Sequence, residues 1–230
     1  MLPRTLEPEV MESAQEARDY NAMDHGVVNR AFADDFLAAV EKCGFAARLR
    51  DPRQPLDLLD VGTGTALIPI EICRRPFFCK VSAVDLSAEM LKVAVRNVFQ
   101  AGLRDRIGVH RVDGKSLPYA DGAWSAVISN SIVHHIPDPR ITIGEMVRVV
   151  RPGGCLFVRD LLRPESVGRV DELVAAYAGD ANPHQQWMFR ESLCAALTVS
   201  ELRELLSTLS LPPDWVEQTS DRHWTISGIL

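Results

Sequence analysis

The sequence predicts an α/β protein built on a doubly wound, mostly parallel sheet that ends in an antiparallel hairpin. Short apolar runs alternate with helical patterns between residues 56 and 160, which is typical of repeated βαβ units. A glycine-rich turn directly follows the first apolar run. The last twenty residues hold two β-like pieces joined by a short polar turn. Strands so close in sequence are antiparallel neighbours, because a parallel crossover needs about a dozen residues or more.

The composition fits one globular domain and excludes several classes of protein. The chain has 230 residues, of which 47% are apolar and 24% charged, and its net charge is −6. This balance excludes disorder of the whole chain, and the negative charge argues against nucleic acid as a partner. Apolar runs are interrupted before the roughly 18 residues that span a bilayer, and the amino terminus lacks the apolar core of a secretory signal. We therefore expect a cytoplasmic protein without membrane insertion.

The five cysteines favour buried thiols over a metal or redox site. They are odd in number, and no two of them form a CxxC pair. Four of the five lie in apolar surroundings, where a free thiol behaves as a small hydrophobic side chain. We therefore expect no metal site.

The order of the expected elements follows the chain. An acidic arm, residues 1–23, precedes a helix with Asp24 as its N-cap and Gly44 as its stop. Seven strands are expected, over residues 56–61, 80–84, 106–112, 123–129, 154–159, 215–219 and 223–227. Helices are expected over residues 68–74, 87–101 (capped by Ser87) and 140–150, and further helices within 161–210, with Arg151-Pro152-Gly153 as a turn before the fifth strand.

The first chemical motif is Asp60-Val61-Gly62-Thr63-Gly64-Thr65, between the first strand and the next helix. Glycines at alternate positions allow a sharp turn and let a ligand approach the backbone without a Cβ in the way. Open α/β sheets bind ligands where a strand's carboxyl end feeds a helix. The motif favours a nucleotide-like ligand over a purely structural turn.

Two further acidic residues follow the next strands. Asp85 ends the second strand, where a carboxylate can accept hydrogen bonds from both hydroxyls of a ribose. The alternative role, capping the following helix, is already filled by Ser87. Asp113-Gly114 follows the third strand, beside the same cleft, where Asp113 could receive an exocyclic amine of adenine. A plain Asp-Gly turn is the competing interpretation.

These motifs together resemble a known family. DVGTGTALIPIEI, VDLSAEML, VDGKSLPYADGAWSAVISNSIVHHIPDP and RVVRPGGCLFVRDL are similar to the ordered motifs of class I S-adenosylmethionine-dependent methyltransferases. The nearest branch is the small-molecule group (methyltransferase type 11) that includes the quinone-biosynthesis C-methyltransferases. The resemblance covers residues 55–160 and implies a Rossmann-like sheet, S-adenosylmethionine as cofactor, S-adenosylhomocysteine as product and a small-molecule methyl acceptor.

The resemblance also implies roles for individual residues. Gly62 and Gly64 would contact the methionine part of the cofactor, Asp85 would hold the ribose, Leu86 would pack on the adenine, and Asp113 would bind the adenine amine. Thr65 stands where many members have a third glycine, at a position that opens the helix. Further cofactor contacts are expected from Asp60, Thr63, Gly114, Asn130 and Tyr20.

The segment after the fourth strand bears on the acceptor. Asn130-Ser131-Ile132-Val133 replaces the Asn/Asp-Pro-Pro-aromatic motif of enzymes that methylate nucleic-acid amines, which argues against that chemistry. His135 occupies the position where several small-molecule methyltransferases place a histidine facing the methyl group, so we predict His135 as the catalytic residue. The alternative for His135 is a structural role, and for His134 a structural role is the expected one.

The resemblance implies a single domain over residues 1–230. Within it we expect a helical arm or lid (1–50), a cofactor-binding core (55–160), a helical segment on the substrate side (161–210) and a C-terminal hairpin (211–230).

Two other functions stay open. A Rossmann-type NAD(P)-dependent oxidoreductase would share the strand, glycine turn and acidic ribose ligand, but the sixth position of its GxGxxG fingerprint is Leu67 here. A non-catalytic module that binds S-adenosylmethionine would need the same residues. The sequence does not name the acceptor or the methylated atom, and it is compatible with a homodimer.

Overall fold

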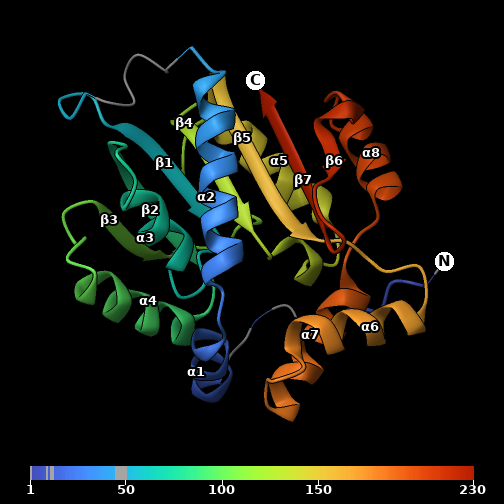
Figure 1. Cartoon of the computed structure of the whole chain (residues 1–230). Coiled ribbons are helices and arrows are strands. Elements are labelled where there is room, and N and C mark those ends of the chain that lie inside the picture. Colours follow the sequence, from blue (N-terminus) through green and yellow to red (C-terminus); the bar gives the residue numbers. More distant parts are fainter. Residues whose placement is uncertain (1, 9, 11–12, 45–50) are drawn as a thin grey trace.

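The strands form one seven-stranded sheet in the order β3-β2-β1-β4-β5-β7-β6 (Figure 1). The computed structural model describes residues 2–8, 10, 13–44 and 51–230. Strands β1 to β5 are parallel, and β7 runs antiparallel to both β5 and β6. The predicted sheet and its terminal hairpin are therefore confirmed. The strands are β1 (Leu56–Val61), β2 (Cys79–Asp85), β3 (Ile107–Arg111), β4 (Trp124–Asn130), β5 (Val150–Leu161), β6 (Val216–Gln218) and β7 (His223–Ile229).

Helices cover both faces of the sheet, and others lie beyond the carboxyl ends of its parallel strands (Figure 1). One face packs against α2 (Gly26–Glu41), α3 (Leu67–Cys73) and α4 (Ala88–Gln100). The opposite face packs against α5 (Pro139–Val149) and α8 (Val199–Thr208). The remaining helices, α1 (Ala14–Ala22), α6 (Val167–Ala178) and α7 (Pro183–Ala195), lie beyond the carboxyl ends of the parallel strands. No helix among the described residues is long and apolar enough to cross a bilayer.

The central strands are buried on both sides, which explains their nearly continuous apolar sequence. Successive side chains of a strand point to opposite faces. Leu58 of β1 accordingly packs in one core cluster with Phe32 and Phe36 of α2. Its neighbour Leu59 packs in the other cluster with Met146 of α5. The two clusters hold the sheet rigidly between its helices and so fix the positions of the strand ends.

The start of α2 differs from the prediction. The N-cap position is His25, which makes no capping hydrogen bond with its side chain, and the helix begins at Gly26. Asp24 lies one residue earlier and accepts a hydrogen bond of 2.9 Å from the Gly26 N–H. The prediction for Ser87 is confirmed, because its hydroxyl accepts the Met90 N–H and caps α4.

The last strands also differ from the expected ranges. Strand β5 already begins at Val150, so Arg151-Pro152-Gly153 lies within it, next to a register shift opposite Trp124 and Ala126. Strand β6 has only three residues, because Trp215 belongs to the 3₁₀ turn η3 (Pro213–Trp215) instead. The Trp215 ring lies against Gly228 of β7, where a Cβ would come within 2.2 Å of it.

The contact between Gly228 and Trp215 leads to a testable prediction. Gly228→Ala should destabilise the protein by about 1–3 kcal/mol, because the added methyl group overpacks a site that the indole ring already fills. Urea unfolding measures the change. The matched control is Gly44→Ala, where a Cβ would meet no heavy atom of the described residues within 4 Å and the effect should stay within about 0.5 kcal/mol. Equal effects of the two substitutions would contradict the prediction.

Candidate active site

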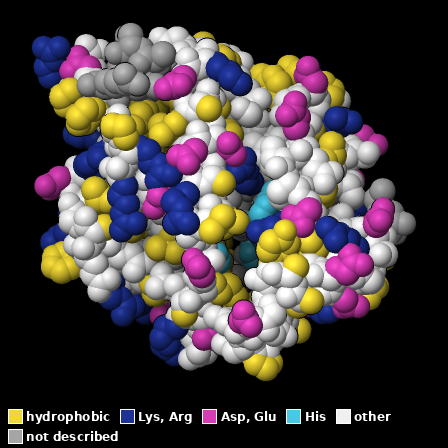
Figure 2. Space-filling model, viewed as in Figure 1, with side chains coloured by type: hydrophobic (Ala, Val, Ile, Leu, Met, Phe, Trp, Pro, Cys, Tyr) yellow, Lys and Arg dark blue, Asp and Glu magenta, His cyan; other side chains and the backbone are white. Residues whose placement is uncertain are grey.

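The candidate site lies where the sheet changes winding direction, at the carboxyl ends of β1 and β4. These strands are neighbours in the sheet, although β2 and β3 come between them in the sequence. The Ser129 hydroxyl donates a hydrogen bond of 2.8 Å to the Val61 carbonyl and joins the two ends. Such a switch point is where open α/β sheets bind their ligands. Figure 2 shows histidine side chains inside a hollow on this side of the molecule.

The glycine turn after β1 requires both of its glycines. Gly62 has φ +75° and Gly64 has φ +54°, in the left-handed region that favours glycine. A Cβ on Gly62 would also lie 2.0 Å from a methyl group of Ile132. The turn is fixed to β2 by hydrogen bonds from the Gly62 and Thr63 N–H groups to the Val84 carbonyl. The backbone of the turn is therefore held open toward the cleft.

Two adjoining cavities at this edge bring all the predicted site residues together. They share Tyr20, Gly62 and Asn130. The first cavity is also lined by Gly64, Asp85, Leu86, Asp113, Gly114 and His135. The second is also lined by Asp60 and Thr63. Residues from four strand ends and from α1 thus surround one continuous site.

Asp85 holds the glycine turn and the start of α4 together at the β2 side of this cleft. One carboxylate oxygen accepts the Gly64 N–H and the other accepts the Ser87 N–H, both at 2.8 Å. Burial raises the pKa of Asp85, and these backbone donors oppose that shift. Each carboxylate oxygen can accept more than one hydrogen bond, so Asp85 can hold the turn and still receive ligand hydroxyls.

Buried polar atoms without partners line the second cavity. In the described part of the chain, no hydrogen bond reaches Asp60 Oδ2, Thr63 Oγ1 or Thr65 Oγ1. Burial raises the pKa of Asp60 to about 7. A buried polar atom without a partner costs free energy, and a ligand that carries an ammonium group would satisfy this carboxylate. The amino group of S-adenosylmethionine fits that requirement.

Asp113 and Tyr20 lie at other walls of the first cavity. Asp113 accepts the Lys115 N–H at 2.9 Å and lies 3.1 Å from the Lys115 ammonium. The Asp-Gly turn is therefore present, whether or not Asp113 also binds a ligand. Tyr20 reaches the cleft from α1, which packs on α4. Burial raises the pKa of the Tyr20 hydroxyl to about 12, so this group stays neutral.

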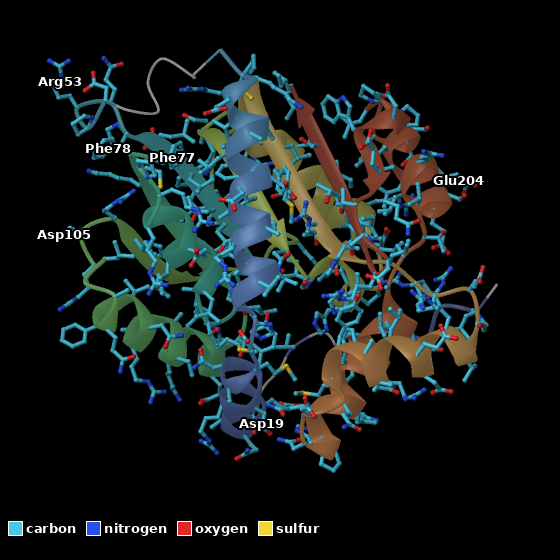
Figure 3. The ribbon with its side chains drawn as sticks, viewed as in Figure 1. Asp19, Arg53, Phe77, Phe78, Asp105 and Glu204 are labelled. Atoms are coloured by element: carbon cyan, nitrogen blue, oxygen red, sulfur yellow. The ribbon has the colours of Figure 1, made fainter. Side chains whose placement is uncertain are left out.

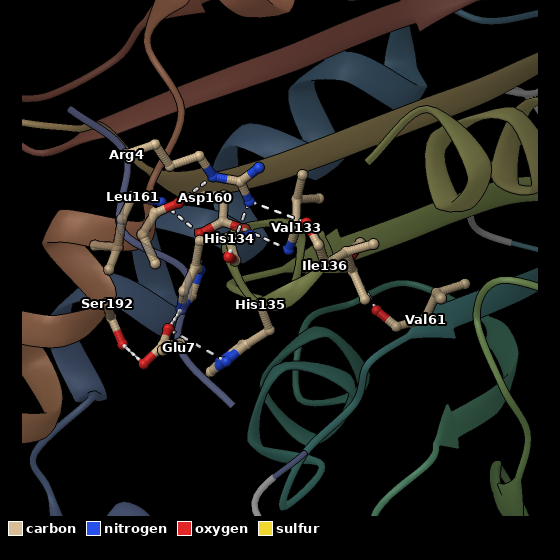
Figure 4. A network of polar contacts seen from close by, with 12 residues as sticks. Arg4, Glu7, Val61, Val133, His134, His135, Ile136, Asp160, Leu161 and Ser192 are labelled. Atoms are coloured by element: carbon tan, nitrogen blue, oxygen red, sulfur yellow. Dashed lines mark hydrogen bonds and ion pairs between the residues drawn. The ribbon is translucent and has the colours of Figure 1, made fainter. Parts of the chain in front are cut away.

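The two histidines belong to the 3₁₀ turn η2 (Val133–His135) and differ in environment (Figure 4). His134 is buried, and its Nδ1 lies 2.5 Å from Asp160 Oδ1. Burial lowers the pKa of His134, but the charge and hydrogen bond of Asp160 together with the charge of Glu7 outweigh burial and raise the pKa overall. Burial raises the pKa of Asp160, but the charge and hydrogen bond of His134 together with the backbone N–H donors outweigh burial and lower the pKa overall. The two residues therefore form a buried ion pair.

His135 lines the first cavity. Its Nδ1 lies 3.3 Å from the Pro8 carbonyl and 3.2 Å from Glu7 Oε1. Burial, followed by the positive charge of His134, lowers the pKa of His135 to about 3. The ring is thus neutral at neutral pH, with a lower basicity than the ordinary pKa of about 6.5 would give it.

Sequence reasoning expected the amino-terminal arm near the site but missed Glu7, Val10 and Asp160. Glu7 lies between the two histidines, and Val10 lines the first cavity. No local pattern marks Glu7, because 127 residues separate the arm from this turn. The position of Asp160 could have been predicted, because it lies near the carboxyl end of β5, the strand beside β4. The other acidic site residues were predicted from the same kind of position.

Comparisons with known proteins agree with this geometry. Residues 59–158 match the family described as Methyltransferase domain. A demethylmenaquinone methyltransferase of Porphyromonas gingivalis is 36% identical over 122 residues, which cover 53% of this chain and 50% of that protein. The chain spans about half the length, or less, of the curated relatives it matches.

Solved structures show the same fold at lower identity. A SAM-dependent methyltransferase of Aquifex aeolicus has a TM-score of 0.55 and 18% identity, covering 81% of this chain and 93% of that one. The [4+2]-cyclase SpnF has a TM-score of 0.59 and 16% identity, covering 99% of this chain and 97% of that one. Both likenesses concern the fold alone.

Residues 59–158 carry a methyltransferase domain, and the sheet order and the cleft at the strand ends agree with the class I fold that the motifs predict. The similarity to a demethylmenaquinone methyltransferase agrees with the small-molecule branch. The resemblance inferred from the motifs is thereby confirmed.

The burial of Asp60 predicts how stability depends on pH. The pKa of this carboxyl is about 7 in the folded chain and about 3.9 in an unfolded one. Between these values the unfolded chain releases its proton while the folded chain keeps it, so stability falls as pH rises. Asp60→Asn cannot release a proton. Relative to the parent it should gain about 2–4 kcal/mol of stability between about pH 4 and pH 8, measured by urea unfolding.

The matched control is Asp57→Asn, an exposed position on the same strand. Its difference in stability from the parent should stay constant over this range to within about 0.5 kcal/mol. A constant difference for Asp60→Asn as well would show that Asp60 does not keep its proton in the folded chain.

Proposed function

We propose that this chain transfers the methyl group of S-adenosylmethionine to a small-molecule acceptor in the cleft at the ends of β1 and β4. One observation carries the proposal: residues from separate strand ends converge on a cleft that contains a buried carboxylate with an unsatisfied oxygen. That arrangement suits a ligand with an ammonium group at one end and a nucleoside at the other.

The proposed placement of the cofactor follows the lining of the two cavities. The open turn at Gly62 and Gly64 lets the methionine part approach the backbone, with its amino group toward Asp60 in the second cavity. The ribose hydroxyls meet Asp85, and the adenine lies against Leu86 with its amine toward Asp113. The sulfonium group then lies between these two parts, near the shared wall of the cavities.

The demands on the protein in such a reaction are mainly positional. The cofactor supplies an activated methyl group with a good leaving group, so the chain has to align the acceptor and exclude water. The walls that could receive an acceptor are largely apolar, because Val10, Ile132 and Ile136 line the first cavity. An acceptor with an apolar ring fits them, and the relative named for a demethylmenaquinone supports this class.

His135 is the proposed general base on the acceptor side. A proton on Nδ1 would be shared by the Pro8 carbonyl and the Glu7 carboxylate, which leaves Nε2 with a free lone pair. That nitrogen can receive the proton of an acidic hydroxyl or carbon acid as the acceptor attacks. Because burial and the neighbouring charge of His134 make the ring a weak base, an acceptor with an acidic proton suits it best.

Cofactor binding separates this function from an oxidoreductase. S-adenosylhomocysteine at about 100 times its Kd should stabilise the protein by about 2.7 kcal/mol, seen as a higher Tm, whereas NAD(P) should cause no shift. Asp85→Asn keeps one oxygen to accept a backbone N–H but loses the charge, so its affinity should fall by about 1.5–3 kcal/mol. A shift with NADH and none with S-adenosylhomocysteine would overturn the proposed function.

Turnover separates a methyltransferase from a non-catalytic binding module and tests His135. With a proton-bearing acceptor such as a hydroquinone, His135→Ala should lower kcat about 10²–10⁴-fold while S-adenosylhomocysteine affinity stays nearly unchanged. His135→Gln, which cannot take up a proton, should lose as much. His110→Ala, at an exposed position on β3, is the control and should keep the parental rate. Parental turnover by His135→Ala would exclude the proposed base.

A further inference from the structure

Beside the cleft, three side chains of metal-binding type converge where the amino-terminal arm crosses η2 (Figure 4). We propose that Glu7, His134 and His135 form a binding site for one divalent transition-metal ion, with Zn²⁺ as the best match. The ion would join the arm to the turn that carries His135.

The spacing of the ligand atoms fits a single ion. Glu7 Oε1 lies 3.3 Å from His134 Nε2 and 3.2 Å from His135 Nδ1. All three atoms lie within 4.8 Å of one another. Tetrahedral Zn²⁺ binds nitrogen and oxygen ligands at about 2.0–2.1 Å, which places neighbouring ligands about 3.4 Å apart. The two separations from Glu7 Oε1 match this value, and the two histidine nitrogens lie no more than 4.8 Å apart.

His134 is oriented as a metal-binding histidine usually is. Its Nδ1 faces Asp160 Oδ1 at 2.5 Å, which leaves Nε2 directed toward Glu7. Metal-bound histidines commonly donate their other N–H to a carboxylate, which fixes the ring and makes it a better ligand. Asp160 is itself fixed by the N–H groups of Val133 and Leu161, each at 2.6 Å.

Glu7 presents an oxygen that lies within ion-pair distance of both histidines without a hydrogen bond to either. Its Oε2 accepts the Ser192 hydroxyl at 3.3 Å, but no hydrogen bond from the described residues reaches the buried Oε1. Both histidine nitrogens lie near Oε1, yet neither makes a hydrogen bond with it. A cation between the three atoms would satisfy all of them at once.

The arm is already fixed in the required position. Arg4 donates hydrogen bonds to the carbonyls of His134, Ile136 and Ala195, at 3.1, 2.9 and 2.7 Å. A bound ion would take the place of the proton that His134 carries in its ion pair with Asp160. Imidazole and carboxylate together suit Zn²⁺ and its neighbours among the divalent transition metals.

A bound ion would change what His135 can do. An ion on Nδ1 displaces the hydrogen from that nitrogen, and the neutral ring then carries its hydrogen on Nε2, which can no longer receive a proton. The loaded protein would therefore methylate proton-bearing acceptors more slowly. This consequence rests on the proposed function, but the metal site itself does not.

Direct titration with Co²⁺, a spectroscopic substitute for Zn²⁺, tests the site. After treatment with a chelator and desalting, the full chain should bind one equivalent of Co²⁺, show the visible absorption of a four-coordinate ion, and lose that absorption when Zn²⁺ is added. Glu7→Gln should weaken Co²⁺ binding by at least about 10–100-fold, the loss that even an outer-shell change causes. Glu204→Gln, at an exposed position on α8 (Figure 3), should bind as the parent does.

The outcomes separate this inference from the proposed function. No Co²⁺ binding by the parent, or equal binding by Glu7→Gln, would overturn the metal site. His135→Gln provides a second ligand variant if circular dichroism shows that Glu7→Gln is unfolded, and equal binding there would overturn the site as well. If the chain binds Co²⁺ but not S-adenosylhomocysteine, the metal site stands and the proposed function is overturned. If it binds S-adenosylhomocysteine but not Co²⁺, the proposed function stands and the metal site is overturned.

Discussion

The buried carboxylate of Asp160 is the interaction on which the acceptor side of the molecule depends. It accepts the backbone N–H groups of Val133, His134 and Leu161 and pairs with the His134 ring. These bonds set the conformation of η2, and η2 in turn holds His135 at the cleft. The arm bonds to carbonyls of the same segment through Arg4. Without this carboxylate, a buried imidazolium and three backbone donors would lose their partner.

The end of β2, which β1 and β4 separate from β5 in the sheet, uses a carboxylate in the same way. Asp85 stands at the end of β2 and accepts N–H groups from the glycine turn and from the first residues before α4. In both places a carboxylate at the end of a strand accepts backbone N–H groups of a neighbouring loop and so fixes the conformation of that loop. Backbone donors also lower the cost of holding a negative charge in a partly buried position. The cleft is thus formed by loops that the sheet itself positions.

The sequence was informative where the signals are local. A strand, a glycine turn and a helix in succession predict the cleft, and the residues at Asp60, Asp85 and Asp113 follow from strand ends alone. The arm could not be placed in this way, because Glu7 meets His134 only through the tertiary fold. The same holds for Trp215, whose strand-like sequence is overridden by its packing on Gly228.

The position of β7 affects how the chain can reach this fold. Strand β7 pairs with β5 along residues 155–161, yet more than sixty residues of chain separate the two strands. During synthesis the parallel core and its helices can form while one side of β5 still lacks a neighbour. Such an open edge exposes unpaired N–H and C=O groups to other chains. A newly made chain is therefore most exposed to aggregation in the interval before β7 inserts between β5 and β6.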